Sequence, residues 1–170
     1  GVALEATAED GSYEDLEWLM GINFWGVVYG TKAFLPHLKA SGDGHVVNIS
    51  SVFGIAGIPS QSAYNAAKFA VRVFTESLSQ ELAITGAPVR ATSVHPGGIK
   101  TNIARAARVD ESLRDLGIDS EDTAENVTEV AGDREARLRG RIECDPLIEE
   151  PDWAQPNLDV LLFNQTELHL

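Results

Sequence analysis

Apolar side chains recur at helical spacing over two long stretches of the chain. The first stretch follows Ser12, a residue type that caps helix N-termini, and its apolar positions are Leu16, Leu19, Met20, Phe24, Val27 and Val28. The second stretch ends at Gly86-Ala87-Pro88, and its apolar positions are Ala63, Ala67, Ala70, Val71, Phe74, Leu78 and Leu82. We therefore predict helices over about residues 13–40 and 62–85, the first one bent near Gly21 or Gly26. Three aromatic residues of the first helix are interpreted as core or helix-packing residues: Trp18, Trp25 and Phe34.

Two short runs rich in β-branched residues follow these helices. The run His45–Ser50 comes after a turn at residues 41–44, and the run Val89–Val94 is followed by Pro96-Gly97-Gly98. Alternation of helix and strand favours a parallel sheet covered by helices, because parallel strands need a crossover connection. Weaker patterns predict three further elements, namely short helices at Ser112–Leu116 and Asp133–Arg139 and a strand at Leu158–Phe163.

The charge of the chain is unevenly distributed. The sequence has 170 residues, of which 44% are hydrophobic, and a formal net charge of −13. Residues 1–109 hold nine acidic and eight basic side chains, whereas residues 110–170 hold 17 acidic and five basic ones. We interpret residues 1–125 as most of a folded domain and residues 126–170 as an acidic segment that is divergent or partly disordered. Because an acidic protein has no overall attraction to nucleic acid or anionic lipid, we predict neither partner.

Several kinds of site and location are disfavoured by simple counts. The single cysteine, Cys144, excludes an intramolecular disulfide and a cysteine metal cluster. No apolar run approaches the roughly 18 residues of a membrane span, and no export signal opens the sequence, so we expect a cytoplasmic protein. The four histidines lack the spacing of metal ligands, so we predict no metal site and expect solvent-facing or capping roles for His37, His45, His95 and His169.

A tyrosine and a lysine lie four residues apart in the second predicted helix. Tyr64 and Lys68 therefore share one helix face, about 5–6 Å apart. A neighbouring ammonium favours the phenolate and lowers the pKa of a tyrosine, so the pair can act as a tuned proton donor or acceptor. The alternative is a surface pair without chemistry, and the spacing alone favours that alternative because such pairs often arise by chance.

Ser51 lies at the end of the first predicted strand. Open parallel sheets bind ligands at the edge formed by the carboxyl ends of their strands. At that edge, the Ser51 hydroxyl can hold a carbonyl or alkoxide oxygen while the tyrosine moves the proton. The alternative interpretation of Ser51 is an ordinary turn residue.

Four motifs occur together along the chain, and their combination favours a catalytic role for Ser51, Tyr64 and Lys68 over the two alternatives without chemistry. They are Ile22-Asn23-Phe24-Trp25-Gly26 followed by Phe34-Leu35-Pro36, then Asn48-Ile49-Ser50-Ser51-Val52-Phe53-Gly54, then Tyr64-Asn65-Ala66-Ala67-Lys68, and finally Pro96-Gly97-Gly98-Ile99-Lys100-Thr101. Tyr64 follows Ser51 by thirteen positions. Over residues 1 to about 125, this combination resembles the short-chain dehydrogenase/reductase family. The resemblance implies a Rossmann-type α/β fold with a doubly wound parallel sheet, of which the chain holds the C-terminal two-thirds.

The resemblance also implies a role for each matching residue. Tyr64 would be the catalytic acid/base, and Ser51 would orient the substrate oxygen. Lys68 would lower the pKa of Tyr64 and hydrogen-bond the ribose of the nicotinamide cofactor, NAD or NADP. Asn23 would hold, through its helix backbone, a water in a proton relay to Lys68. Further cofactor contacts are implied for Pro96, Gly97 and Thr101, which would line the nicotinamide pocket, and for Gly1, which matches the last residue of the family's Asn-Ala-Gly motif.

One family motif does not occur in the sequence. The Gly-rich turn that lets a pyrophosphate approach a helix N-terminus is missing. We therefore interpret the chain as an N-terminally truncated member that is inactive alone. Two functions are considered: an NAD(P)-dependent oxidoreductase that transfers hydride between nicotinamide and a small-molecule ketone or secondary alcohol, or a non-catalytic remnant that serves as a structural or oligomerisation module. The resemblance implies a homo-oligomer through the helices at 13–40 and 62–85.

Overall fold

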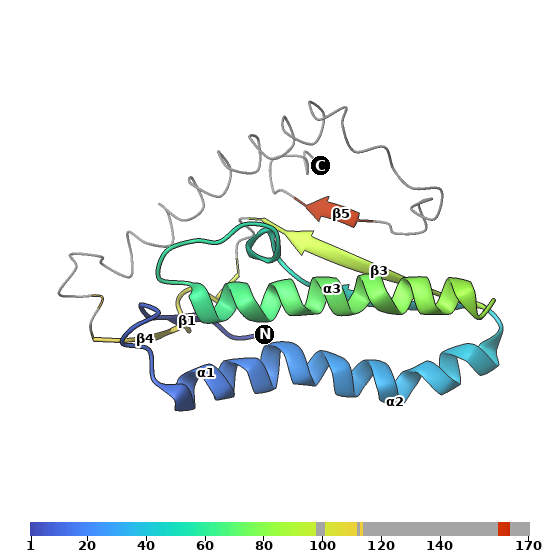
Figure 1. Ribbon diagram of the computed structural model, residues 1–170, viewed down its shortest axis with the longest axis horizontal. Coiled ribbons are helices and arrows are strands. Elements are labelled where there is room, and N and C mark those ends of the chain that lie inside the picture. Colours follow the sequence, from blue (N-terminus) through green and yellow to red (C-terminus); the bar gives the residue numbers. More distant parts are fainter. Residues whose placement is uncertain (98–100, 112, 114–159, 164–170) are drawn as a thin grey trace, which may run out of the picture.

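The computed structural model describes residues 1–97, 101–111, 113 and 160–163. Two long helical segments lie side by side beneath a small parallel sheet (Figure 1). The helical elements are α1 (Tyr13–Met20), a π-helical segment (Gly21–Trp25), α2 (Gly26–Ser41), a 3₁₀ turn (Val52–Gly54) and α3 (Ser62–Ile84). The strands are β1 (Leu4–Glu5), β2 (Gly44–Ile49), β3 (Val89–Pro96), β4 (Arg108–Val109) and β5 (Val160–Phe163).

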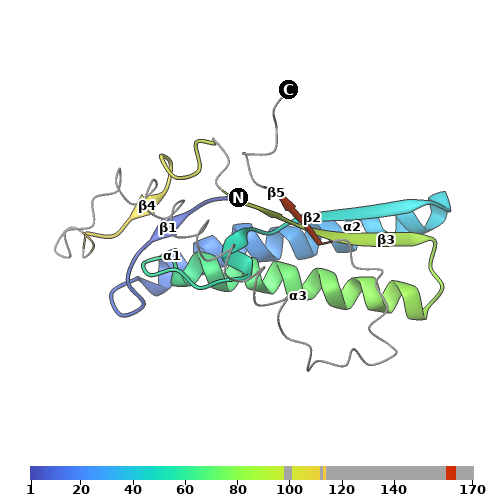
Figure 2. The same ribbon diagram turned by 90° about the horizontal axis from the view of Figure 1, so that it is seen from above.

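The main sheet is parallel, with strand order β2-β3-β5. Strand β2 pairs with β3 from Gly44 opposite Val89 to Ile49 opposite Val94, and β3 pairs onward with β5. Figure 2 shows β2 and β3 running alongside each other. The predicted parallel sheet and the predicted strand within 158–163 are confirmed. Because β3 lies between two partners, β2 is an edge strand among the residues that the structure describes.

The first long helix contains the predicted irregularity. Ser12 caps α1, its hydroxyl accepting a hydrogen bond from the backbone N–H of Asp15 at 3.1 Å. At Gly21–Trp25 the backbone widens into one π-helical turn, with the Gly26 N–H donating to the Gly21 carbonyl. Helix α2 ends at Gly42, whose φ of 81° is readily adopted only by glycine. The expected bend near Gly21 or Gly26 is therefore this π-helical turn.

A second small sheet was not predicted from the sequence. Strands β1 and β4 pair in parallel through two residues each, too few to give a periodic pattern. Arg108 of β4 also binds α1: its guanidinium forms an ion pair with Asp15 at 2.6 Å and lies 3.6 Å from the centre of the Trp18 ring. These contacts hold the segment around residue 108 against the start of α1.

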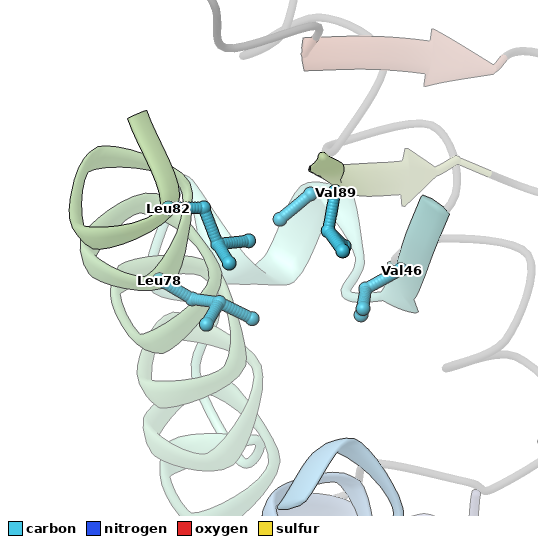
Figure 3. Close-up of a cluster of buried hydrophobic side chains, with 5 residues drawn as sticks. Val46, Leu78, Leu82 and Val89 are labelled. Carbon is cyan, nitrogen blue, oxygen red and sulfur yellow. The ribbon is translucent and has the colours of Figure 1, made fainter. Parts of the chain in front are cut away.

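The main apolar cluster lies between the sheet and the helices. Val46, Val89 and Ala91 of the sheet contact Leu78 and Leu82 of α3, as Figure 3 shows for four of these residues. Leu35 and Leu38 of α2 pack against the same cluster. Both helical segments therefore cover one face of the sheet. On the opposite face of β2, Val47 and Ile49 are each 50% exposed.

Two of the three aromatic residues that were interpreted as core or helix-packing residues are instead largely exposed. Trp25 is 47% exposed and Phe34 is 66% exposed. The side of α2 that faces the sheet carries Leu35 and Leu38, and Trp25 instead stacks on the exposed Tyr29, with ring centroids 5.8 Å apart. The core assignment was wrong for Trp25 and Phe34, because the apolar positions of this helix cover more than one face and periodicity alone does not choose between them.

Some sequence predictions fall outside the described residues. These are the boundary near residue 125, most of the helix predicted at Ser112–Leu116, the helix predicted at Asp133–Arg139, Cys144 and His169. They stay predictions.

The apolar cluster leads to a test of the fold. Leu82 is 3% exposed, whereas Ile84 on the same helix is 85% exposed. Truncating a buried leucine removes its packing and leaves a cavity, so we expect Leu82→Ala to lower the free energy of unfolding by about 2–5 kcal/mol. Ile84→Ala is the control and should change it by less than about 0.5 kcal/mol. Urea unfolding followed by circular dichroism measures both, and equal losses for the two variants would contradict this placement of the core.

Candidate active site

Ser51 is the second residue after β2, at the carboxyl end of the strand. Its backbone is extended, with φ −167° and ψ 162°, and it caps the short 3₁₀ turn that follows. The hydroxyl oxygen accepts a hydrogen bond from the Phe53 N–H at 3.1 Å. This contact orients the Ser51 side chain before any ligand arrives.

Tyr64 and Lys68 lie one turn apart at the start of α3. The Lys68 ammonium is 5.5 Å from the centre of the Tyr64 ring, so the predicted shared face is confirmed. Lys68 is only 6% exposed, and its Nζ donates a hydrogen bond to the Ile49 carbonyl at 3.1 Å. The Ser51 side chain adjoins the Tyr64 phenol and favours its ionised form, so the phenol lies by the end of β2. The structure thus brings Ser51, Tyr64 and Lys68 together.

The pKa of Tyr64 differs from the sequence prediction. A lowered value was predicted from the neighbouring ammonium, but burial raises the pKa of Tyr64, and the hydrogen bond with Ser51 offsets only part of this effect. Burial also lowers the pKa of Lys68. The prediction was wrong for the chain by itself, because it considered charge and neglected the removal of water from the phenol.

Asn23 lies in the π-helical turn and is 2% exposed. Its side-chain amide makes two hydrogen bonds to the backbone of Val2: the Val2 N–H donates to Oδ1 at 2.9 Å, and Nδ2 donates to the Val2 carbonyl at 2.7 Å. This side-chain anchor was not predicted. It fixes the first residues of the chain beside the site, while the backbone role implied for Asn23 stays a prediction.

Gly1 adjoins both Asn23 and Lys68. A Cβ atom on Gly1 would lie 2.9 Å from Asn23 Oδ1 and 3.7 Å from Lys68 Nζ. A side chain there would therefore crowd the Asn23 anchor and fill space next to the ammonium. The position of Gly1 agrees with its predicted place at the site.

The other predicted cofactor contacts are less closely tied to this cluster. Pro96 ends β3 and Gly97 follows it, both partly buried. Thr101 is exposed, and its hydroxyl accepts a long hydrogen bond of 3.4 Å from the Ile103 N–H. The structure thus places Pro96 and Gly97 at the carboxyl end of a strand adjacent to β2, whereas no recorded contact joins Thr101 to Tyr64 or Lys68.

A set of buried polar groups fixes the loop after Ser51 against α3. The Asn65 side chain accepts from the Ile58 N–H at 3.1 Å and donates to the carbonyls of Phe53 and Ala56 at 2.7 and 2.9 Å. Sequence reasoning missed this role, although Asn65 stands inside the Tyr-Asn-Ala-Ala-Lys motif. An asparagine with no helix end to cap, one turn after a loop rich in Gly and Ser, is the signal that points to such bonds.

Close contact between this loop and α3 also requires a glycine. The Ser50 hydroxyl donates to the Lys68 carbonyl at 2.8 Å. A Cβ on Gly54 would overlap the Ser50 hydroxyl and approach the Lys68 carbonyl oxygen to 2.8 Å. Gly54 therefore permits the contact that holds the end of β2 onto the turn of α3 that carries Lys68.

The prediction for the histidines is wrong at one position. His37 and His45 are exposed, as expected, but His95 is fully buried at 0% exposure. Its ring contacts the Ser51 carbonyl and the Ser93 hydroxyl. The available signal was a histidine directly after the run Val89–Val94, which is typical of a buried strand.

The described residues also bear on metal binding and on membrane insertion. They contain no group of three or more histidine, cysteine or acidic side chains placed to hold a metal ion. None of the helices in this part of the chain is long and apolar enough to cross a membrane.

Comparison with known proteins places this site in a family. A family model described as short chain dehydrogenase matches residues 1–112. SadH of Mycobacterium tuberculosis, named as an oxidoreductase, is 59% identical over 109 residues, which cover 64% of this chain and 40% of that protein. The NADP-dependent (R)-specific alcohol dehydrogenase of Lentilactobacillus kefiri is 38% identical over 102 residues, covering 59% of this chain and 40% of that protein. The chain thus spans about two fifths of the length of these relatives.

Solved structures agree with this assignment. A short chain dehydrogenase/reductase from Burkholderia phymatum in complex with NAD matches with a TM-score of 0.60 and 34% identity, covering 62% of this chain and 38% of that one. A short-chain dehydrogenase from Streptomyces avermitilis has a TM-score of 0.65 at 24% identity, covers 98% of this chain and 59% of that one, and so supports the fold. The Rossmann-type α/β class is confirmed, and the chain belongs to the short-chain dehydrogenase family.

Proposed function

We propose that the protein is an NAD(P)-dependent oxidoreductase that transfers hydride between nicotinamide and the carbonyl carbon of a ketone or secondary alcohol. Tyr64 gives a proton to the carbonyl oxygen during reduction and takes it back during oxidation. The Ser51 hydroxyl holds the same oxygen, and Lys68 supplies positive charge next to the phenol. The observation that carries this proposal is the cluster itself: the Tyr64 phenol beside the Ser51 side chain, with the buried Lys68 ammonium 5.5 Å from the centre of the tyrosine ring.

The chemistry follows from what each group can do in its position. A carbonyl that receives hydride becomes an alkoxide and needs a proton at once. Because burial raises the pKa of Tyr64, the phenol is protonated at neutral pH and serves as the donor. The Phe53 N–H donates to the Ser51 hydroxyl oxygen, which leaves the hydroxyl hydrogen free to point toward the substrate oxygen or the tyrosine.

The surroundings of Lys68 fit a nicotinamide cofactor. An ammonium has three N–H donors, and the described residues use one of them, at the Ile49 carbonyl. The two remaining donors suit neighbouring hydroxyls of a ribose, and the absence of a side chain on Gly1 leaves space beside them. The bound nicotinamide would supply or accept the hydride. Lys68, Gly1, Pro96 and Gly97 are the residues that would hold it, with Thr101 as a further contact from the sequence prediction.

Names and titles of similar proteins support the cofactor and the substrate class. The Burkholderia phymatum structure is a complex with NAD, and a gluconate 5-dehydrogenase from Burkholderia cenocepacia, 30% identical with a TM-score of 0.57, is a complex with NADP and tartrate. The Lentilactobacillus kefiri relative acts on alcohols by name. These proteins use either nicotinamide cofactor, so both NAD and NADP stay open for this chain. A non-catalytic structural module is the less favoured alternative, because the Ser51, Tyr64 and Lys68 cluster is intact.

We also propose that the protein forms a homo-oligomer through its two long helices. Exposed aromatic residues gather on α2 and the turn before it: Trp25 at 47%, Tyr29 at 65% and Phe34 at 66% exposure. On α3, Val73 and Ile84 are 54% and 85% exposed. Apolar side chains of this size on helix surfaces favour association, and the net charge of −13 opposes it only within the screening length of about 8 Å at physiological salt.

The first prediction concerns the tyrosine. In the complete gene product, we expect Tyr64→Phe to lower kcat/KM by a factor of about 10²–10⁴, because it removes the proton donor and keeps the ring. The measurement follows reduced nicotinamide absorbance with a panel of ketones and secondary alcohols. Tyr13→Phe is the matched control, since Tyr13 is 88% exposed on α1. Wild-type turnover in a folded Tyr64→Phe protein would overturn the assignment.

The second prediction concerns pH. Burial raises the pKa of Tyr64, so the phenol stays protonated as pH rises through neutrality and loses its proton only above its usual range. We expect kcat for ketone reduction to be flat between about pH 6 and pH 9, and kcat for alcohol oxidation to increase with pH over that interval. Steady-state kinetics in both directions with a non-titrating substrate measure the profiles. A fall in reduction across this interval would point to a different acid.

The third prediction concerns association. Light scattering coupled to size exclusion should give a mass above the 18.3 kDa of the 170-residue chain. Replacing Trp25 by Glu introduces a charge at the proposed contact and should shift the protein toward a monomer. Val109→Glu is the control, because Val109 is 39% exposed on β4 and belongs to neither long helix. A monomeric mass for the unsubstituted chain would contradict the proposal.

A further inference from the structure

We propose that His95 is a positioning residue for Ser51, holding the Ser51 peptide group so that its hydroxyl points at the substrate oxygen. The inference rests on the proposed function, in which Ser51 holds that oxygen. His95 touches none of the reacting groups. It acts through the backbone of Ser51, from the strand next to β2.

The ring of His95 bridges two buried partners. Its Nδ1 lies 3.0 Å from the Ser51 carbonyl oxygen, and its Nε2 lies 3.1 Å from the Ser93 hydroxyl. Both His95 and Ser93 are fully buried at 0% exposure. The His95 ring is buried, and both of its nitrogens are hydrogen-bonded, one to Ser51 and one to Ser93. The ring is therefore held in one orientation.

The partners also determine which nitrogen carries the hydrogen. A carbonyl oxygen only accepts hydrogen bonds, so Nδ1 must carry the proton and donate to Ser51. In the neutral ring Nε2 then has a free lone pair, and the Ser93 hydroxyl donates to it. Burial lowers the pKa of His95, which keeps the ring neutral at physiological pH. The Ser51 carbonyl therefore selects the tautomer protonated on Nδ1, and the Ser93 hydroxyl, which can donate or accept, is compatible with it.

The bond lies where the pairing of β2 with β3 ends. The Ser50 N–H donates to the Val94 carbonyl at 2.7 Å, and the last paired residues of the ladder are Ile49 and Val94. Ser51 is the next residue, already outside the ladder. The His95 side chain thus extends the connection between the two strands by one residue, through a side chain instead of the backbone.

This extension fixes the direction of the Ser51 side chain. The Ser51 carbonyl accepts two hydrogen bonds, from His95 Nδ1 and from the Gly54 N–H at 2.8 Å. Two donors at fixed angles hold the plane of that peptide group. Since the Cα atom of Ser51 lies in this plane, a shift of the plane would also shift the Ser51 side chain. A displacement of about 1 Å at a reacting group can cost about 10²-fold in rate.

Two substitutions separate this role from simple packing. In His95→Asn, the side-chain amide nitrogen can occupy the place of Nδ1 and donate to Ser51. In His95→Gln, the longer side chain reaches instead toward the place of Nε2, near Ser93, and the Ser51 carbonyl loses its side-chain donor. Both variants remove the ring, so a loss of packing alone would affect them similarly.

The first readout needs no substrate. The Phe53 N–H is bonded to the Ser51 hydroxyl oxygen, so its amide resonance in ¹⁵N NMR spectra reports the Ser51 orientation. Ser51→Ala gives the reference position for the broken bond. We expect His95→Gln to move the Phe53 resonance toward that reference and His95→Asn to leave it near the wild-type position. Equal spectra for the two variants would overturn the inference.

The second readout is kinetic, with any ketone that the unsubstituted protein reduces. We expect His95→Gln to lower kcat by about 10- to 100-fold with little change in cofactor Kd, and His95→Asn to recover most of the loss. On a Ser51→Ala background, His95→Gln should lower kcat no further, because it acts through Ser51. Multiplying losses would show that His95 acts elsewhere and would overturn the inference.

The outcomes for the two proposals are distinguishable. If no substrate is reduced, the proposed function fails, while the NMR comparison still decides the role of His95. If His95→Gln does not fold, the ring resonances of the unsubstituted protein give the test, with His95→Asn used to assign them. A proton on Nδ1 of His95 supports the inference, and a proton on Nε2 alone would overturn it.

Discussion

The cost of burying the Lys68 ammonium constrains the arrangement of the whole site. An ammonium group that is removed from water must be hydrogen-bonded, because otherwise the neutral, deprotonated amine is favoured. Lys68 is 6% exposed, and the structure provides the Ile49 carbonyl at 3.1 Å as an acceptor. That carbonyl belongs to the last residue of β2, so the same bond ties α3 to the end of the strand that precedes Ser51. The position of the lysine and the position of the serine are thus set together.

Several hydrogen bonds between uncharged groups also hold the end of β2 and the following loop against α3 and β3. The Ser50 hydroxyl binds the Lys68 carbonyl, and Asn65 holds three backbone groups of the loop between β2 and α3. His95 adds a bond from β3. Because buried polar groups cost free energy when unpaired, each of these bonds penalises displacement of the loop. A rigid support of this kind is what precise placement of a catalytic hydroxyl requires.

The sequence predicts the helices and strands that carry the site better than it predicts the hydrogen bonds that hold them together. The helices, the two paired strands and the alignment of Tyr64 with Lys68 follow from periodicity, because each depends on a regular repeat within one segment. Apart from Ser93, which is two positions from His95, the partners of Asn65, Asn23 and His95 are 7 to 44 positions away in sequence. Such partners are fixed by how elements pack, and no local pattern encodes them. The exposure of Trp25 and Phe34 escaped prediction for a related reason: an apolar residue on a helix can face the core or a partner surface.

The pKa of Tyr64 shows why residue spacing alone is a poor guide to proton chemistry. The spacing correctly places an ammonium near the phenol, and a positive charge at that distance favours the phenolate. The packing of α3 against Leu4 and the loop of Ser51 also removes water from both groups. Desolvation acts on each side chain against its charged form, so it raises the pKa of Tyr64 and lowers that of Lys68. The unliganded chain is therefore biased toward a neutral phenol, the form that donates a proton to a carbonyl oxygen. In the proposed function, oxidation of an alcohol needs the phenolate, and we expect charge that arrives with the bound ligands to favour it. Proton acceptance by Tyr64 would then be coupled to the filling of the site.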